Sequence, residues 1–115
     1  MTDARKARMV KNEVLFRSVN ERMKELTDEL AFDGVVGEEH REQYLCECVD
    51  ADCTTRIELS DDEYERVRSN FAWFAVAPGH VVAEVERVVD EGERFWMVEK
   101  HPGEREIARH ENPRS

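Results

Sequence analysis

The sequence predicts an α+β fold, in which a long N-terminal helix packs on a small, mainly antiparallel sheet and one short helix crosses between strands. Three observations predict it: an N-terminal stretch with helical spacing of apolar residues, several β-prone runs separated by turn residues, and a helix-capping motif at Ser60. The 115 residues suffice for one domain and are too few for two. We expect the helix in residues 1–35, an α+β core in 40–100 and a tail in 101–115.

The first helix carries an apolar stripe whose members are spaced seven, three, four, three and four residues apart: Met9, Phe16, Val19, Met23, Leu26 and Leu30. This period is about 3.5 residues, and charged residues occupy the other faces. The stripe either packs on the chain's own sheet or forms the seam of a homodimer, although Asn12 and Asn20 weaken the interpretation as a seam. If it packs on the sheet, we expect Phe16, Val19, Met23 and Leu26 to be buried within one chain.

Turn residues divide the middle of the chain into short β-prone segments. Residues 43–49 and 54–59 are expected to pair as a hairpin, with the side chains of Cys46 and Cys48 on one side of the first strand. Aromatic residues in 71–77 indicate a third strand. The valines of 81–89 fit either a helix or a strand, and we favour a strand that pairs with residues 95–99.

A short helix is expected to begin after Ser60, between the second and third strands. Glu63 stands three residues after Ser60, which is the spacing of a capping box. Asp61 and Asp62 complement the positive end of the helix dipole. Near the end of the chain we expect a tail, with a short helical turn around Ile107 as the alternative.

The net charge of −10 opposes nucleic-acid binding, because phosphate contacts require a basic face. Residues 1–12 are locally basic and form either a solvated helix start or an arm that contacts RNA, DNA or an acidic partner. No apolar run is long enough for a membrane span, and no signal peptide is apparent. We therefore expect a cytoplasmic protein with reduced thiols, since three cysteines is an odd number.

The strongest chemical signal is Cys46-Glu47-Cys48, followed by Cys53 and by His80 in a Pro-Gly-His turn. Three thiolates and one imidazole form a tetrahedral zinc site in many small proteins, so we expect these four side chains to bind Zn²⁺. The spacing lacks the common C-x2-C knuckle, and His40 or His101 are alternatives to His80 as the fourth ligand.

Two other interpretations of the cysteines stay open: buried core residues, or a redox-reactive thiol pair. A nucleophilic Cys–His pair oriented by Asp50 or Asp52 is conceivable, but nothing in the spacing supports it. We assign no catalytic residue and favour a protein that is not an enzyme.

Five segments of the chain form one pattern: Val19-Asn20-Glu21-Arg22, Cys46-Glu47-Cys48 with Cys53, Glu63-Tyr64-Glu65-x-Val67-Arg68, Pro78-Gly79-His80 and Val98-Glu99-Lys100. In these segments the chain resembles a family of small uncharacterised actinobacterial proteins. The resemblance covers about residues 16–100, and its most specific part is the order CEC, C, PGH. The resemblance implies no activity, but it implies that the cysteines and His80 belong to one site.

These observations favour a small zinc-binding module that acts through protein–protein contacts in a regulatory role. One alternative is a thiol-based redox or metal sensor that uses the same cysteines. The other is a metal-free adaptor that dimerises through the first helix.

Overall fold

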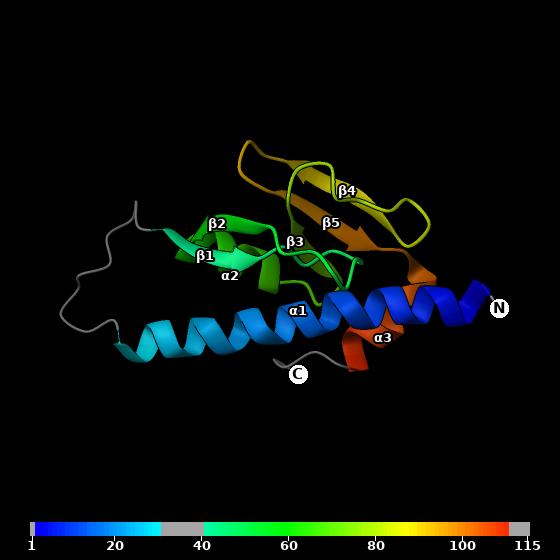
Figure 1. Ribbon diagram of the computed structural model, residues 1–115, viewed down its shortest axis with the longest axis horizontal. Coiled ribbons are helices and arrows are strands. Elements are labelled where there is room, and N and C mark those ends of the chain that lie inside the picture. The colour runs from blue at the N-terminus through cyan, green and yellow to red at the C-terminus, as the bar shows by residue number, and fades with distance from the viewer. Residues whose placement is uncertain (1, 31–40, 111–115) are drawn as a thin grey trace.

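The fold combines one long helix with two small sheets, as seen in a computed structural model that describes residues 2–30 and 41–110 (Figure 1). The elements are α1 (Thr2–Leu30), β1 (Arg41–Leu45), β2 (Arg56–Ser60), α2 (Asp61–Arg68), β3 (Trp73–Val76), β4 (Glu86–Glu91), β5 (Trp96–Lys100), η1 (Pro102–Glu104) and α3 (Arg105–His110). The predicted α+β class is confirmed, with α1 running along one side and α2 crossing between β2 and β3.

The strands form two antiparallel sheets rather than the single sheet that we expected. One contains β1 and β2, and the other has the order β3-β5-β4. The first strand ends at Leu45, before the cysteines, because the chain then leaves β2 and the Glu47 amide donates to the Ala75 carbonyl of β3 at 2.8 Å. The hairpin of β4 and β5 is confirmed, although β4 begins only at Glu86.

The short helix α2 begins as the capping box predicts. The Glu63 amide donates to the Ser60 hydroxyl, and the Ser60 amide donates to the Glu63 carboxylate. Its buried Tyr64 stacks on Tyr44 of β1, with ring centroids 4.5 Å apart. This contact fixes α2 against the two-stranded sheet.

The inward face of α1 is largely charged, so the prediction that its apolar stripe is buried is wrong for Val19 and Leu26, whereas Phe16 and Met23 are half-buried and Met23 packs against the core. Val19 and Leu26 are 39% and 42% exposed, and the side chain of Leu30 lies outside the described residues. Among the side chains of this helix that the structure describes, residues 4–26, the buried ones are Val10, Glu13, Val14, Arg17, Asn20, Glu21 and Lys24. Asn20 donates to Leu45 of β1, Arg17 donates to Ala108 of α3, and Glu13 accepts from Lys100 of β5, and these hydrogen bonds select a face that apolar periodicity alone does not reveal.

Six of the buried charged residues surround Phe74 or bind one another, and we call them the ionic layer: Glu13, Arg17, Glu47, Arg68, Glu86 and Lys100. The Lys100 ammonium binds the carboxylates of Glu13 and Glu86, and all three side chains are fully buried. Arg68 binds Glu47 at 2.9 Å. The layer brings together side chains from α1, α2, the segment after β1 and the three-stranded sheet.

Residues 101–110, expected to belong to a tail, are ordered as η1 and α3, so the alternative of a helical turn around Ile107 is confirmed. The Arg17 guanidinium donates to the Ala108 carbonyl at 2.8 Å, which ties α3 to α1. Within the part of the chain that the structure describes, no helix combines the length and the apolar character needed to span a bilayer.

Candidate metal centre

Cys46, Cys48 and Cys53 lie on the segment that connects β1 to β2, and we call residues 46–53 the metal loop. Backbone hydrogen bonds close both the base of this loop and the turn within it. The Cys46 amide donates to the Thr55 carbonyl at 3.1 Å, and the Cys53 amide donates to the Asp50 carbonyl at 3.0 Å. The Asp52 amide also donates to the Asp50 carboxylate at 2.9 Å. The turn therefore brings Cys53 back toward the first two cysteines.

His80 reaches the loop from the end of β3 through a tight turn. The His80 amide donates to the Ala77 carbonyl at 2.9 Å, with Pro78 and Gly79 between them. Gly79 has φ +86°, the left-handed conformation that the third residue of a type II turn requires. A side chain at this position would strain the turn even though the space around it is open.

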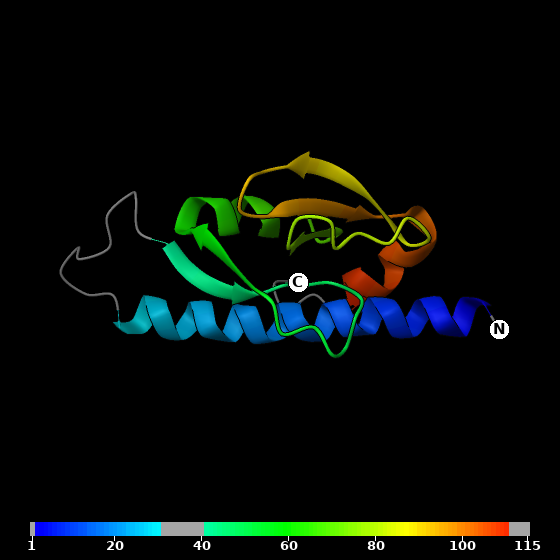
Figure 2. The ribbon, with the colours of Figure 1, turned by 45° about the horizontal axis from the view of Figure 1, so that its top comes forward.

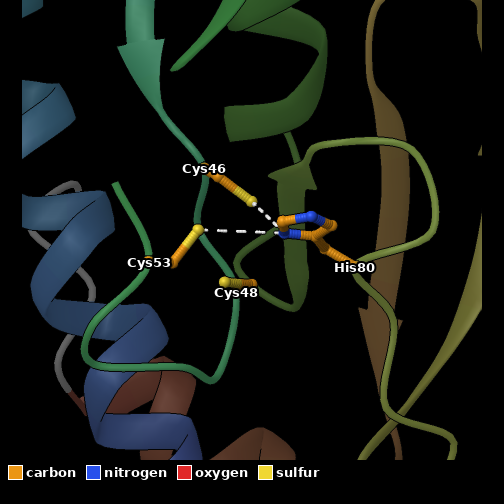
Figure 3. Close-up of side chains that lie close together, drawn as sticks. All are labelled: Cys46, Cys48, Cys53 and His80. Carbon is orange, nitrogen blue, oxygen red and sulfur yellow. Dashed lines mark hydrogen bonds between the residues drawn. The ribbon is translucent and has the colours of Figure 1, made fainter. Parts of the chain in front are cut away.

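The structure brings the four predicted side chains together (Figure 3). Their sulfur and nitrogen atoms all lie within 4.8 Å of one another. The Nδ1 atom of His80 is 3.5 Å from the Cys46 sulfur and 3.8 Å from the Cys53 sulfur. Two donors of one tetrahedral zinc are separated by about 3.5–3.8 Å, so the longest separation exceeds this by only about 1 Å.

The other candidate ligands do not join this cluster. His40 lies outside the described residues. The His101 ring is instead 2.8 Å from the Ala83 carbonyl. Arg56, a basic residue three positions after Cys53, is exposed, whereas the Ala77 amide donates to the Cys46 sulfur at 3.1 Å. A backbone amide is therefore the group that the structure provides to stabilise a thiolate.

Two asparagines of α1 bracket the metal loop. Asn20 binds the backbone of Leu45 twice, accepting from its amide at 2.8 Å and donating to its carbonyl at 3.0 Å. Asn12 donates to the Val49 carbonyl at 2.9 Å. Leu45 and Val49 directly flank the Cys46–Cys48 segment, so α1 fixes the backbone from which two of the sulfurs project.

Glu47 lies between two candidate ligands and turns the opposite way, into the ionic layer. Its fully buried carboxylate accepts hydrogen bonds from Asn20 at 2.8 Å, Arg68 at 2.9 Å and the Ala75 amide at 3.0 Å. The side chains of residues 46–48 thus alternate between the two regions. The predicted shared orientation of Cys46 and Cys48 holds, although they lie beyond the end of the strand.

The thiols of Cys46 and Cys48 titrate as a pair. The hydrogen bond with Cys48, together with burial, raises the pKa of Cys46 well above its usual range. The same hydrogen bond lowers the pKa of Cys48 to about 5. One proton is therefore shared between them, and a metal ion that binds both sulfurs must displace it.

Burial of the four side chains is graded. Cys46 and Cys48 are buried, Cys53 is half-buried and His80 is exposed. Three sulfurs and one ring nitrogen are the donor set of soft, tetrahedral metal ions, so the cluster could hold one such ion with the His80 side facing water.

Sequence reasoning found the donors but missed the groups that position them, namely Asn12, Asn20 and Glu47. The polar residues on the inward face of α1 were the available signal, and we interpreted Asn12 and Asn20 only as a weakness in the apolar stripe. No family model, curated protein or solved structure matches this chain.

Proposed function

We propose that the protein is a small zinc-binding module in which Cys46, Cys48, Cys53 and His80 hold one structural Zn²⁺. The observation that carries this proposal is the convergence of all four donor atoms within 4.8 Å from two separate turns. Three thiolates, a neutral imidazole and Zn²⁺ sum to a charge of −1, and the Ala77 amide bonded to Cys46 offsets part of it.

A four-ligand site leaves no coordination position for a substrate, which favours a binding module over an enzyme. We infer that the module acts in the cytoplasm through contacts with other proteins, in a regulatory role. The net charge of −10 supports this choice over nucleic-acid binding.

Metal analysis of protein purified without a histidine tag tests the proposal. We expect one zinc per chain, and we expect chelation at neutral pH to lower the melting temperature by roughly 10 °C or more, because structural zinc contributes on the order of 10 kcal/mol to folding. Added zinc should restore it. Identical melting of metal-free and zinc-loaded protein would contradict the proposal.

Single substitutions identify the ligands in the same assay. Cys46→Ser, Cys48→Ser and Cys53→Ser should each abolish stoichiometric zinc, whereas His80→Ala should weaken binding less, because water can enter its exposed position. His101→Ala is the matched control, since this histidine lies elsewhere and contacts the Ala83 carbonyl. Loss of zinc in the control but not in His80→Ala would refute the assignment of the fourth ligand.

A second candidate is a redox sensor, favoured by the half-buried Cys53 and the exposed His80 on one side of the cluster. In that role two thiols pass two electrons and two protons to hydrogen peroxide, which becomes two water molecules as one disulfide forms. Mild peroxide would then release the zinc, and a thiol reductant with added zinc would restore it. Retention of zinc under these conditions identifies a purely structural site.

A further inference from the structure

The candidate metal centre has a buried side and an exposed side. Cys46 and Cys48 are 1% and 4% exposed, whereas Cys53 is half-buried and His80 is exposed. The contact of the Cys53 sulfur with Nδ1 of His80 lies at the surface, and the contact of the Cys46 sulfur with the same nitrogen is partly buried. In Figure 2 the segment between β1 and β2 extends past the strands and lies across α1. A reagent dissolved in water therefore reaches Cys53 before the other two sulfurs.

The surroundings of Cys53 leave its sulfur open to attack. Its neighbours Asp52 and Thr54 are both exposed, and Cys53 projects from the returning arm of the metal loop (Figure 3). The Cys46 sulfur, by contrast, is buried and accepts a hydrogen bond from the Ala77 amide at 3.1 Å. Such a bond stabilises a thiolate and makes it a weaker nucleophile. Cys53 is therefore the sulfur of the centre that combines access with nucleophilic character.

Charge narrows the class of reagent that can approach this sulfur. The thiolate is the nucleophilic form of cysteine, and bound zinc keeps it deprotonated at neutral pH. Three thiolates, a neutral imidazole and Zn²⁺ carry a charge of −1, and the exposed carboxylates of Asp50 and Asp52 lie on the turn that leads to Cys53. These charges repel an anion but not an uncharged molecule. The reagent that fits this site is a small, uncharged electrophile.

We propose that Cys53 is a modification site at which a small, uncharged alkylating electrophile opens the metal centre, a proposal that rests on the zinc-binding function proposed above. The Cys53 sulfur donates an electron pair to the electrophilic carbon. A sulfur–carbon bond forms as the bond from that carbon to its leaving group breaks, and the leaving group departs with the electron pair of the broken bond. The sulfur is then a neutral thioether, a much weaker ligand for Zn²⁺ than a thiolate, so the ion is released. Unlike disulfide formation, this step consumes one sulfur and requires no oxidant.

Iodoacetamide, an uncharged alkylating reagent whose leaving group is iodide, tests the proposal on the zinc-loaded chain. Peptide mapping by mass spectrometry at early times should find Cys53 modified about tenfold or more faster than Cys46 and Cys48, because those two sulfurs are buried. A colorimetric zinc indicator should report release of the ion at the same rate. Modification of Cys46 or Cys48 first would overturn the proposal, and so would zinc that stays bound after Cys53 is alkylated.

Iodoacetate has the same leaving group but a negative charge, so it measures the charge selectivity. After correction for the ratio of the two rates at free cysteine, it should modify Cys53 about threefold or more slowly than iodoacetamide, because like charges repel. Asp52→Asn should narrow this difference. Asp62→Asn, at an exposed position in the first turn of α2, is the matched control and should leave it unchanged. Equal selectivity at Cys53 and at free cysteine would contradict the assignment to uncharged electrophiles.

Cys53→His supplies a second test, because an imidazole in place of the thiolate retains four zinc donors without the reactive sulfur. The variant should keep one zinc per chain and release it about tenfold or more slowly in iodoacetamide, and release at the wild-type rate would refute the role of Cys53. The mapping of the wild type needs no variant and decides the proposal even if Cys53→His fails to fold. A wild type that contains no zinc before the reagent is added refutes the metal centre itself, whereas a zinc-loaded chain that is not modified at Cys53 refutes only the present proposal.

Discussion

The metal loop and the ionic layer both bury ionisable side chains, but the charges of those side chains are balanced in different ways. The ionic layer contains three acids and three bases, so its formal charges cancel within the chain. The metal loop supplies three thiols, which the His80 imidazole meets from the end of β3, and no side chain of residues 46–53 is a cation that could pair with a thiolate. The first region is complete in the chain, whereas the second needs an added cation to hold three thiolates.

Glu47 makes the two regions dependent on each other. Its backbone belongs to the metal loop between Cys46 and Cys48, and its carboxylate binds Arg68 and Asn20 in the ionic layer. A structural change in the metal loop or in the ionic layer should therefore affect the other region through residues 46–48. Buried charge in a small domain therefore does not by itself identify a ligand site, whereas a set of metal-binding donors without a countercharge does.

Among the glutamate substitutions that test how the two regions differ, Glu47→Gln should have the largest effect. The change leaves the Arg68 guanidinium, whose side chain is 2% exposed, without its carboxylate, and an unpaired buried charge costs about 3–5 kcal/mol. Zinc affinity should fall by about tenfold or more, because the flanking sulfurs lose their support. Urea denaturation and competition with a zinc chelator measure the two effects.

Glu58→Gln is the control for this change, since Glu58 is an exposed glutamate of β2. It should alter stability by less than about 0.5 kcal/mol. If Glu47→Gln lowers stability but leaves zinc affinity unchanged, the metal loop and the ionic layer are independent of each other.

The regions also differ in how far the sequence predicts them. The four donors are recognisable in the sequence because the cysteines are few and clustered. Pro78-Gly79 predicts the turn that places His80 beside them. The capping box likewise locates α2 through contacts within four residues. Such local signals need no knowledge of the rest of the fold.

The ionic layer was not predictable, because it is built from pairs far apart in the chain. Lys100 and Glu13 are separated by 87 positions, and Arg17 and Ala108 by 91. In a sequence, charged residues at helical spacing predict the solvent-exposed face of a helix. The face of α1 that carries Glu13 and Arg17 is therefore expected to be exposed, although it is buried in the structure. Only the tertiary partners of Glu13, Arg17 and Asn20 reveal that this face is buried.

A smaller effect is expected from Glu13→Gln, and it should depend on pH. Burial, the main cause, raises the pKa of Glu13 well above its usual range, and nearby Glu86 adds to this while Lys100 opposes it. The folded pKa exceeds the unfolded one, so the unfolded chain ionises first and wild-type stability declines as pH rises between the two values. Glutamine does not titrate and removes this decline.

Unfolding free energies of metal-saturated wild type and Glu13→Gln, compared between about pH 5 and 8, measure the effect. The unfolding free energy of Glu13→Gln relative to that of the wild type should increase as pH rises, by up to about 1.4 kcal/mol per pH unit between the unfolded and the folded pKa of Glu13. Glu106→Gln, at an exposed position of α3, should run parallel to the wild type. A constant difference for Glu13→Gln would mean that this carboxyl titrates alike in both states.

The smallest effect should come from Glu63→Gln, at the edge of the molecule away from both regions. Glu63 binds Arg94 through two hydrogen bonds, which lower the pKa of its carboxyl. The folded pKa lies below the unfolded one, so this stabilisation is present above the unfolded pKa and is lost as pH falls through the folded pKa. Glutamine can keep the capping box, so the change isolates the ion pair.

Because the side chains of Glu63 and Arg94 are about one-third exposed, we expect Glu63→Gln to lower the free energy of unfolding by only ~0.5–1 kcal/mol at neutral pH. Urea denaturation measures this loss, with Glu91→Gln as the control. A loss as large as that of Glu47→Gln would show that exposure does not separate surface pairs from the ionic layer.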